Sequence, residues 1–428
     1  MAGYGSVDSV HDSSSVEGGP PKGAPAPEAQ VEFYGDGAPA GGGGRSRSGW
    51  TWRATVLAVL AFIVAAAVVA WFIQLPYYAL TPGAAPEVSG LITVPAPYHH
   101  AHRGSVLLVY VELTPLRALY YPFFWLDPNA AIYSSSEILG TETTAQYATE
   151  GEIDMSTAQQ AATVVALQQL GYKVPVQELG ALIYGILPAS PAEAALQVGD
   201  VISAVNGVKV PTYVGLSTKL EALAPGATVH LVVSAYPAGK ARTVTLQLGV
   251  FRTTGPGSYS CFAEGKGTKY AITQFQVGTD KRPRSVACLG IYPQGSGGTA
   301  VDGTAFKVGP LPVKVDLSSE GIVGPSAGLA FTLGLIEELD KADLTGGRKI
   351  AATGTMSIDG TVGDVGGVAQ KTIAVRGAGA TVFLVPSPEY SVAKAHAGPH
   401  LKVYAIDTIG QAIKILESLG GRISRTTA

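Results

Sequence analysis

The chain has 428 residues, a formal net charge of −3 and a mean hydropathy of +0.25, and only 14% of its residues are charged. A typical soluble domain carries about 25% charged residues, and glycine, with 54 residues here, also exceeds its usual share of about 7%. This composition excludes a largely disordered polyelectrolyte, the absence of a basic run argues against electrostatic binding of nucleic acid, and the length predicts about two or three domains.

The N-terminal part of the sequence predicts a tail followed by a membrane anchor. Residues 1–49 are rich in Gly, Pro, Ser and Ala without apolar periodicity, which predicts a disordered tail. Residues 54–73 are free of charge, and a helix of this length spans about 30 Å, the thickness of a bilayer core. We therefore predict a transmembrane anchor over 50–78. A cleaved signal peptide is the alternative, but its apolar region would be only about 7–15 residues long and would not follow such a tail.

The flanks of this segment predict its orientation. Arg45, Arg47 and Arg53 precede it, whereas no Lys or Arg follows it before Arg103. Cytoplasmic flanks carry the excess of positive charge, so we expect a single-pass protein of the cell membrane with a cytoplasmic tail and everything after Tyr78 on the extracytoplasmic side. Aromatic residues typical of the two membrane interfaces border the span: Trp50, Trp52, Trp71, Tyr77 and Tyr78.

Residues 79–171 predict a membrane-proximal α/β region, with a strand-like run at 105–111 and a helix at 156–170 that ends before Gly171. Three imidazoles, from His99, His100 and His102, lie close together in this region. A metal site and a solvated loop are the two interpretations. Because no Asp, Glu or Cys accompanies the imidazoles at ligand spacing, the sequence predicts no metal site.

Residues 172–250 predict a β-rich module. An apolar run is followed by S-P-A-E-A-A at 190–195 and by G-D-V-I-S-A-V-N-G at 199–207, which contains the hairpin signal Asn-Gly. This order resembles a bacterial PDZ domain. The resemblance implies that an extended peptide adds to a strand at 182–187, beside a helix at 216–223 and a carboxylate-binding loop at 179–181. The implied peptide-binding residues are Gly180, Ala181, Leu182 and Ile183. A module that serves only packing or orientation is the alternative.

The segment 251–305 contains both cysteines, Cys261 and Cys288, and is either an insertion or the start of the next domain. Two distant cysteines do not form a zinc module. In an exported region they could form one disulfide, which would stabilise the fold by about 3 kcal/mol in the chain-entropy model. A buried free pair is the alternative.

A reactive serine is indicated by Gly-Pro-Ser-Ala-Gly at 324–328, which follows an alternating strand at 312–317 and precedes an apolar helix face. The free backbone amides of Ser326 and Ala327 at a helix start suit a developing oxyanion. The motif also fits the nucleophile elbow of α/β-hydrolases, with His396 or His400 as the base. Against that interpretation, residues 318–323 separate the strand from the serine, and no His-Gly-Gly motif occurs.

A lysine is the other candidate base. Lys371 opens a predicted short helix in which Val368, Ala374 and Val375 share its face, so its amine could be desolvated. Desolvation disfavours the charged form, and it is how a lysine pKa of about 10.4 is brought towards 7–8, where the amine can accept a proton.

Three ordered motifs at 324–328, 353–355 and 360–371 resemble the proteolytic domain of Lon, the Ser-Lys peptidase family, over 306–422. The resemblance implies that Ser326 is the nucleophile, that Lys371 is the general base and that Thr353 supports the lysine by a hydrogen bond. No G-x-x-x-x-G-K-[ST] motif occurs, so we expect proteolysis without ATP and without a cofactor. Because Lon-type domains assemble into rings, the resemblance also implies a homo-oligomer.

Together these patterns predict a multi-domain α/β (α+β) protein with an N-terminal transmembrane helix, a PDZ-like module and a C-terminal Lon-type proteolytic domain. This arrangement is similar to the membrane-anchored, PDZ-containing Lon-like proteases of bacteria. The predicted function is a membrane-anchored serine endopeptidase that cleaves exported or membrane polypeptides with a Ser-Lys dyad, with the PDZ module docking the substrate. The alternative is a catalytically silent, membrane-tethered PDZ scaffold.

Overall fold

The fold is taken from a computed structural model that describes residues 48–140, 143–187, 189–237, 239–255, 258–262, 272–273, 286–292, 303–319 and 321–424. The predicted tail, 1–49, lies outside the described residues except for its last two positions, which open the first helix.

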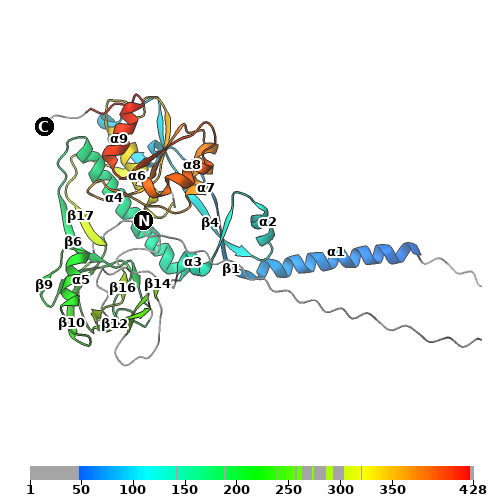
Figure 1. Ribbon diagram of the computed structural model, residues 1–428, viewed down its shortest axis with the longest axis horizontal. Helices are drawn as coiled ribbons and strands as arrows, with labels where there is room; N and C mark the ends of the chain where they lie inside the picture. Colours follow the sequence, from blue (N-terminus) through cyan, green and yellow to red (C-terminus); the bar gives the residue numbers. More distant parts are fainter. Residues whose placement is uncertain are drawn as a thin grey trace, which may run out of the picture. The chain divides into compact units, whose positions relative to one another are not determined.

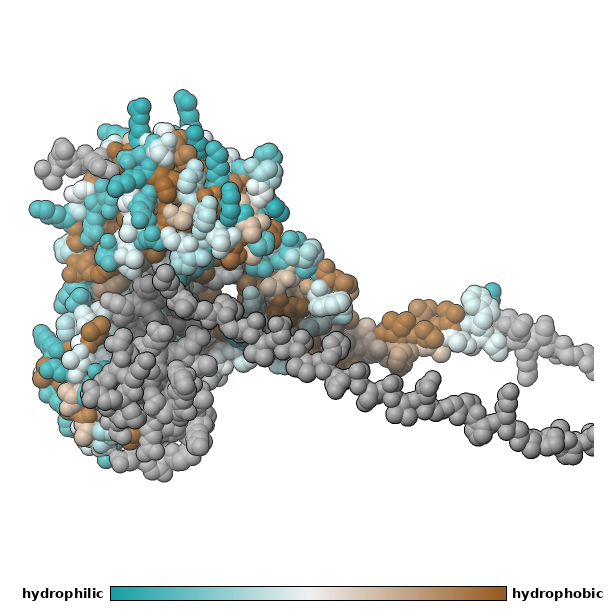
Figure 2. Space-filling view, viewed as in Figure 1, coloured by the Kyte–Doolittle hydropathy of each residue, from teal (hydrophilic) through white to brown (hydrophobic). Residues whose placement is uncertain are grey.

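The first helix, α1, spans Ser48–Phe72 and contains the predicted apolar segment. Within it, Thr51–Phe72 is long and apolar enough to cross a membrane, by length and composition. None of this stretch is buried, and Figure 2 shows hydrophobic residues exposed along the helix. The predicted helix is therefore confirmed, and most of its side chains are exposed among the residues that the structure describes.

A small antiparallel sheet follows α1. Its central strand is β1 (Gln74–Pro82), which pairs with β4 (Val111–Arg117) on one side and β5 (Ala131–Ser134) on the other. The short helix α2 (Tyr121–Leu126) connects β4 to β5, and α3 (Ser135–Leu139) follows.

A parallel four-stranded sheet carries the largest part of the fold, with the strand order β23-β22-β19-β3. Its strands are Ser105–Leu108 (β3), Lys349–Ala352 (β19), Val382–Pro386 (β22) and Lys402–Ile406 (β23). The surrounding helices are Thr144–Gln169 (α4), Gly328–Leu339 (α6), Val368–Gly377 (α7), Tyr390–His396 (α8) and Ile409–Ser418 (α9). Figure 1 shows α6, α7, α8 and α9 grouped in the yellow-to-red part of the chain.

Both faces of this sheet are covered, which makes it an α/β/α arrangement. Alternate residues along a strand point to opposite faces. Accordingly, Ile350 and Leu384 share one core with Leu333 of α6 and Ile413 of α9. Their strand neighbours, such as Phe383, lie in a second core with residues of α7 and α8, including Val375 and Ala393. The expected mixed α/β fold class is confirmed.

The fold around the parallel sheet is not continuous in sequence, and here the structure differs from the expected boundaries. Strand β3 comes from the region 79–171 but pairs with β19, and β2 (Ile92–Thr93) pairs with β18 (Asp316–Leu317). The helix expected at 156–170 is the C-terminal part of α4, which packs on α6. Strands β2 and β3 and helix α4, which come from residues 79–171, therefore belong to this domain, whereas β4 and β5 pair with β1 in the small sheet.

A second, antiparallel sheet lies between α4 and α6 in the sequence, with the order β11-β10-β8-β6-β17 and β9 paired to β8. Its strands are Val176–Leu182 (β6), Asp200–Val205 (β8), Val208–Lys209 (β9), Thr228–Ala235 (β10), Arg242–Gln247 (β11) and Thr304–Val308 (β17). Asn206 and Gly207 join β8 to β9 with positive φ angles of 50° and 77°, as the Asn-Gly signal predicts. The expected helix at 216–223 is α5, Tyr213–Glu221.

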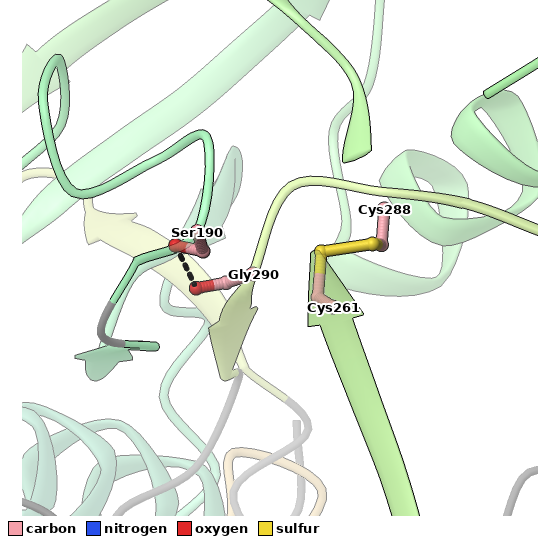
Figure 3. Close-up of a disulfide and its surroundings, with 4 residues drawn as sticks. All are labelled: Ser190, Cys261, Cys288 and Gly290. Carbon is pink, nitrogen blue, oxygen red and sulfur yellow. Dashed lines mark hydrogen bonds between the residues drawn. A yellow bond between two sulfur atoms is a disulfide. The ribbon is translucent and has the colours of Figure 1, made fainter. Parts of the chain in front are cut away.

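A small sheet ordered β14-β13-β12-β15 carries both cysteines. Its strands are Gly249–Gly255 (β12), Ser258–Phe262 (β13), Ile272–Thr273 (β14) and Val286–Cys288 (β15). Cys261 and Cys288 lie on the strands that flank β12, with Cα atoms 6.0 Å apart, and form a disulfide (Figure 3). Ala287 and Leu289 join the core of the second sheet, and β16 (Ile291–Tyr292) pairs with β7 (Gly185–Ile186). This segment therefore extends the β-rich module.

Four short 3₁₀ helices and one further hairpin complete the described elements. The helices are Val88–Leu91 (η1), Ala96–Tyr98 (η2), Pro325–Ala327 (η3) and Ser387–Glu389 (η4). The hairpin pairs Thr355–Met356 (β20) with Val362–Gly363 (β21).

Candidate active site

Ser326 lies in η3, immediately before α6, and is half-buried. Gly324 precedes it with φ of 92°, a conformation that L side chains rarely adopt, and its amide donates to the Gly151 carbonyl of α4 at 2.8 Å. Gly328 packs against β20 so closely that an added Cβ would lie 2.8 Å from the Met356 nitrogen. The small residues around the serine are therefore required by the turn and by close packing.

Thr353 immediately follows strand β19 and lies beside the serine backbone. Its hydroxyl donates to the Ser326 carbonyl at 3.3 Å, and the Gly354 amide donates to the same carbonyl at 3.0 Å. The Gly354 carbonyl in turn accepts from the Leu329 amide at 3.0 Å. These bonds fasten the serine turn and the first turn of α6 to the end of a core strand, which fixes the backbone at the candidate nucleophile.

Lys371 lies on the first turn of α7 and is buried, with 3% of its surface exposed. Its Nζ atom donates to the Thr353 hydroxyl at 3.3 Å. Burial lowers the pKa of Lys371 from 10.5 to about 7, and the carboxylate of Glu389 opposes part of this shift. Burial thus favours the neutral form of this amine, and a neutral amine can accept a proton.

Glu389, at the end of η4, is a residue that the sequence analysis did not identify. Its Oε1 atom accepts from the Val365 amide at 3.3 Å, and Oε2 is buried without a hydrogen-bond partner among the described residues. Burial raises the pKa of Glu389, as does the nearby Asp364, whereas Lys371 lowers it. No local signal distinguishes Glu389, because its relation to the lysine arises only when η4 and α7 fold together.

The three expected residues are linked in a chain rather than by one direct contact. Lys371 donates to Thr353, and Thr353 donates to the carbonyl of Ser326. Within the part of the chain that the structure describes, no hydrogen bond joins the Ser326 hydroxyl to the Lys371 amine. The structure thus links a half-buried serine, a threonine and a buried lysine through hydrogen bonds, and serine and lysine are residue types that can act as nucleophile and base.

The two histidines of the hydrolase alternative lie elsewhere. His396 is on α8, where its Nδ1 atom bonds the Val392 carbonyl at 2.9 Å, and His400 is exposed in the following loop. Among the described residues neither histidine is linked to Ser326 by a hydrogen bond, whereas Lys371 is linked to the Ser326 backbone through the Thr353 hydroxyl, which favours the lysine as the base.

Comparison with known proteins agrees with this arrangement. Residues 304–416 match the family model of the Lon protease (S16) C-terminal proteolytic domain, and residues 168–248 match that of the PDZ domain. The chain carries a PDZ domain and a Lon-type proteolytic domain. It is 31% identical over 112 residues to a Lon protease of Phenylobacterium zucineum (strain HLK1); the match covers 26% of this chain and 14% of that relative.

The PDZ domain places its expected peptide-binding residues differently from the sequence interpretation. Gly180, Ala181 and Leu182 belong to β6, which lies between β8 and β17 in the sheet. The Leu182 amide donates to Gly303 and the Ile183 amide donates to Asp200, each at 2.8 Å. These backbone groups pair with the chain itself, and within the expected peptide-binding strand at 182–187 the short strand β7 pairs with β16. The strand beside β6, β17, comes from a distant part of the sequence.

The histidine-rich loop before the Lon-type sheet also differs from expectation, because acidic residues distant in sequence contact it. His99 Nδ1 lies 2.7 Å from Glu338 Oε2, and His102 Nδ1 lies 3.9 Å from Glu337 Oε1. Both glutamates belong to the last turns of α6. The imidazoles are therefore not a purely solvated loop.

Proposed function

We propose that this protein is a serine-type endopeptidase in which Ser326 is the nucleophile and Lys371 the general base. The observation that carries the proposal is the buried Lys371 amine, with its pKa lowered to about 7 and its hydrogen bond to Thr353 beside the Ser326 turn. The match to the Lon-type proteolytic domain supports the same assignment. Thr353 acts as a positioning residue, because it holds both the amine and the serine backbone.

The chemistry follows from these roles. The neutral Lys371 amine takes the proton of the Ser326 hydroxyl while Oγ forms a bond to the carbonyl carbon of the scissile peptide. The resulting oxyanion is stabilised by the Ser326 and Ala327 backbone amides at the start of the helical segment. The lysine then gives its proton to the leaving amine, the C–N bond breaks, and an acyl-enzyme forms. Water hydrolyses this ester through the same base, which restores the serine.

Helix α1 and the PDZ domain indicate the location of the protein and the kind of substrate that it cleaves. We propose that α1 anchors the protein as a single span, with the tail in the cytoplasm, and that the substrates are exported or membrane polypeptides. Arg45, Arg47 and Arg53 before the span support this orientation. The PDZ domain docks the polypeptide, cleavage needs no ATP, and the Lon-type domain self-associates into a ring.

The test uses the purified full-length protein in detergent with an unfolded, fluorescently labelled polypeptide. Ser326→Ala and Lys371→Met should each reduce turnover by about 1,000-fold or more, because each removes a reacting group. The matched controls are Ser418→Ala and Lys394→Met, which alter exposed residues of α9 and α8 and should leave turnover unchanged. Turnover that survives in both site variants would refute the dyad, and peptide binding without any cleavage by the wild type would favour the scaffold alternative.

A further inference from the structure

A cluster of potential metal ligands lies at the end of α6 opposite to the Ser326 turn. The donor atoms of His102, Glu337 and Asp343 all lie within 4.8 Å of one another. The side chains of His102 and Glu337 are almost fully buried, with 7% and 6% exposed. Beside them is a cavity of about 220 Å³ whose lining includes His99, His100, His102, Glu337 and Glu338.

Backbone and hydroxyl groups hold both carboxylates of this cluster in place. Glu337 accepts from the Leu344 amide at 2.8 Å and from the Thr345 hydroxyl at 3.1 Å. The same hydroxyl, which has one proton to donate, also lies 2.7 Å from Asp343 Oδ1, and this oxygen accepts from the Gly347 amide at 3.2 Å. Neutral donors of this kind orient carboxylates for metal binding while lone pairs remain for the ion, as the outer shell of a metal site does.

The imidazole supplies an independent observation. His102 Nδ1 lies 3.9 Å from Glu337 Oε1, which is beyond hydrogen-bond distance, and the Nε2 atom of His102 is buried and has no hydrogen-bond partner among the described residues. A buried polar atom without a partner is unfavourable, and imidazole nitrogen is a common ligand of zinc. Two ionised carboxylates together carry two negative charges, which a divalent cation would balance, and the imidazole adds a neutral ligand.

We propose that His102, Glu337 and Asp343 bind a divalent transition-metal ion of the zinc type, with water from the adjacent cavity as a fourth ligand. Zinc–ligand distances of about 2.0–2.2 Å require only a small closing movement of donors already within 4.8 Å of one another. The ion would fasten the loop at 99–104 to the end of α6. Its role is structural and does not depend on the proposed proteolysis.

Zinc alone is the probe in the test. The full-length protein is stripped with a chelator, reloaded with Zn²⁺, and measured for metal content and for affinity against a chromophoric chelator. The wild type should hold one zinc per chain, and His102→Ala and Asp343→Asn should each weaken binding by at least about 100-fold, since even outer-shell changes cost 10–100-fold. His230→Ala, on an exposed strand position, is the control and should bind as the wild type does.

Two results would overturn the metal site. One is a wild-type protein that takes up no zinc after reloading. The other is a His102→Ala protein with an unchanged circular dichroism spectrum that still binds zinc as tightly as the wild type. Zinc should also raise the melting temperature of the wild type and not that of Asp343→Asn, whose shape is nearly that of the original residue.

A different observation concerns α2, whose sequence Tyr-Pro-Phe-Phe-Trp-Leu contains no charge. Phe123, Trp125 and Leu126 are 69%, 69% and 71% exposed. Three such side chains on a six-residue helix form a concentrated apolar surface, which marks an interaction site on a soluble face.

The place of α2 in the chain identifies what covers this surface. The segment just before α2 is joined to the end of α1: the Leu119 amide donates to the Ala70 carbonyl at 3.2 Å, and Arg117 donates to the Trp71 carbonyl at 3.3 Å. The rings of Trp71 and Tyr120 lie edge to face at 5.6 Å. Thus α2 begins at the level where the apolar span ends.

The distribution of tryptophan supports a lipid surface. The chain has four tryptophans: Trp50, Trp52 and Trp71 flank the span, and the fourth, Trp125, is on α2. Tryptophan concentrates at the boundary between lipid headgroups and acyl chains. We propose that α2 lies in this boundary on the side of the membrane that holds the Lon-type domain, as a second contact that fixes the domain's orientation. This proposal depends on the proposed anchoring by α1.

Depth-dependent quenching tests the membrane contact in vesicles of phosphatidylcholine and phosphatidylglycerol with brominated acyl chains. In a variant that keeps only Trp125, the brominated lipids should quench the tryptophan fluorescence. The emission maximum should also lie at a shorter wavelength than that of a tryptophan exposed to water. The control carries its single tryptophan as Tyr172→Trp, in the exposed turn after α4, and should be quenched little.

A variant that keeps only Trp71 distinguishes failure of the α2 contact from failure of the anchoring by α1. If Trp71 is quenched but Trp125 is quenched no more than the control, α2 does not contact lipid, although α1 anchors the protein. If neither is quenched, the anchoring itself fails and the α2 contact fails with it. Cross-linking of α2 to a second copy, with Trp125 unquenched, would assign the surface to self-association instead.

Discussion

Replacing the candidate base should stabilise the protein while it abolishes activity. Burial lowers the pKa of Lys371 from 10.5 to about 7. Between these values the unfolded chain binds a proton that the folded chain does not, so folding stability rises with pH across this window. One pKa unit corresponds to about 1.4 kcal/mol. The lowered pKa of Lys371 therefore reduces the free energy of unfolding by about 4 kcal/mol at pH 7, by about 2 kcal/mol at pH 9, and by almost nothing above pH 10.5.

Lys371→Met removes this cost because methionine fills a similar volume without a charge. It also removes the hydrogen bond to Thr353, which is worth about 1 kcal/mol. We therefore expect the variant to be more stable than the wild type by about 3 kcal/mol at pH 7 and by about 1 kcal/mol at pH 9. Urea unfolding of both proteins in detergent, followed by circular dichroism at the two pH values, measures the difference.

The change with pH is the decisive part of this experiment, because the other titrating groups are common to both proteins. Lys394→Met, at an exposed position of α8, is the matched control and should show no gain at either pH. If the gain of Lys371→Met were the same at both pH values, the lysine would not titrate in this window and the argument for a neutral base would fail.

Three further predictions concern the same site. Glu389→Gln removes the charge that favours the protonated amine, so the pKa of Lys371 should fall further and the acidic limb of the pH–rate profile should move to lower pH. Thr353→Val should reduce kcat by about 10–100-fold with little change in KM, and Thr353→Ser should restore most of it, measured by steady-state peptide cleavage. Gly328→Ala places a Cβ 2.8 Å from the Met356 backbone, so it should lower the melting temperature and displace the serine turn, with a loss of probe labelling at Ser326.

The sequence was sufficient for those parts of the site that are encoded locally. The serine turn, the Thr-Gly pair and the lysine helix each occupy a few consecutive residues, and the structure brings Ser326, Thr353 and Lys371 together. Likewise, Asn206-Gly207 predicted the hairpin, because positive φ at both positions is a local property.

The parts that could not be predicted depend on pairing between distant segments. Residues 179–181 were expected to form a loop, but they lie in β6, and nothing near them in the sequence indicates that β17, more than 100 residues later, pairs with this strand. The carboxylates of Glu337 and Glu338 face the histidines at 99–102 only because α6 packs beside that loop. Long-range packing of this kind leaves no periodic signal within either segment.

The Lon-type domain is built from segments that lie before and after the PDZ domain in the sequence. The chain leaves the Lon-type domain through α4 and returns through β17, so the PDZ domain is attached at both ends. Along α4, the Gly151 carbonyl holds the Gly324 amide of the serine turn, and Gln160 donates to the Tyr236 hydroxyl of the β-rich module. Tyr236 in turn donates to the carbonyl of Phe306 in β17, a residue whose side chain lies in the Lon-type core. One continuous helix thus contacts both the Ser326 turn and the PDZ domain. Because a packed helix moves as a unit, a shift of α4 at one of these contacts should also displace the other.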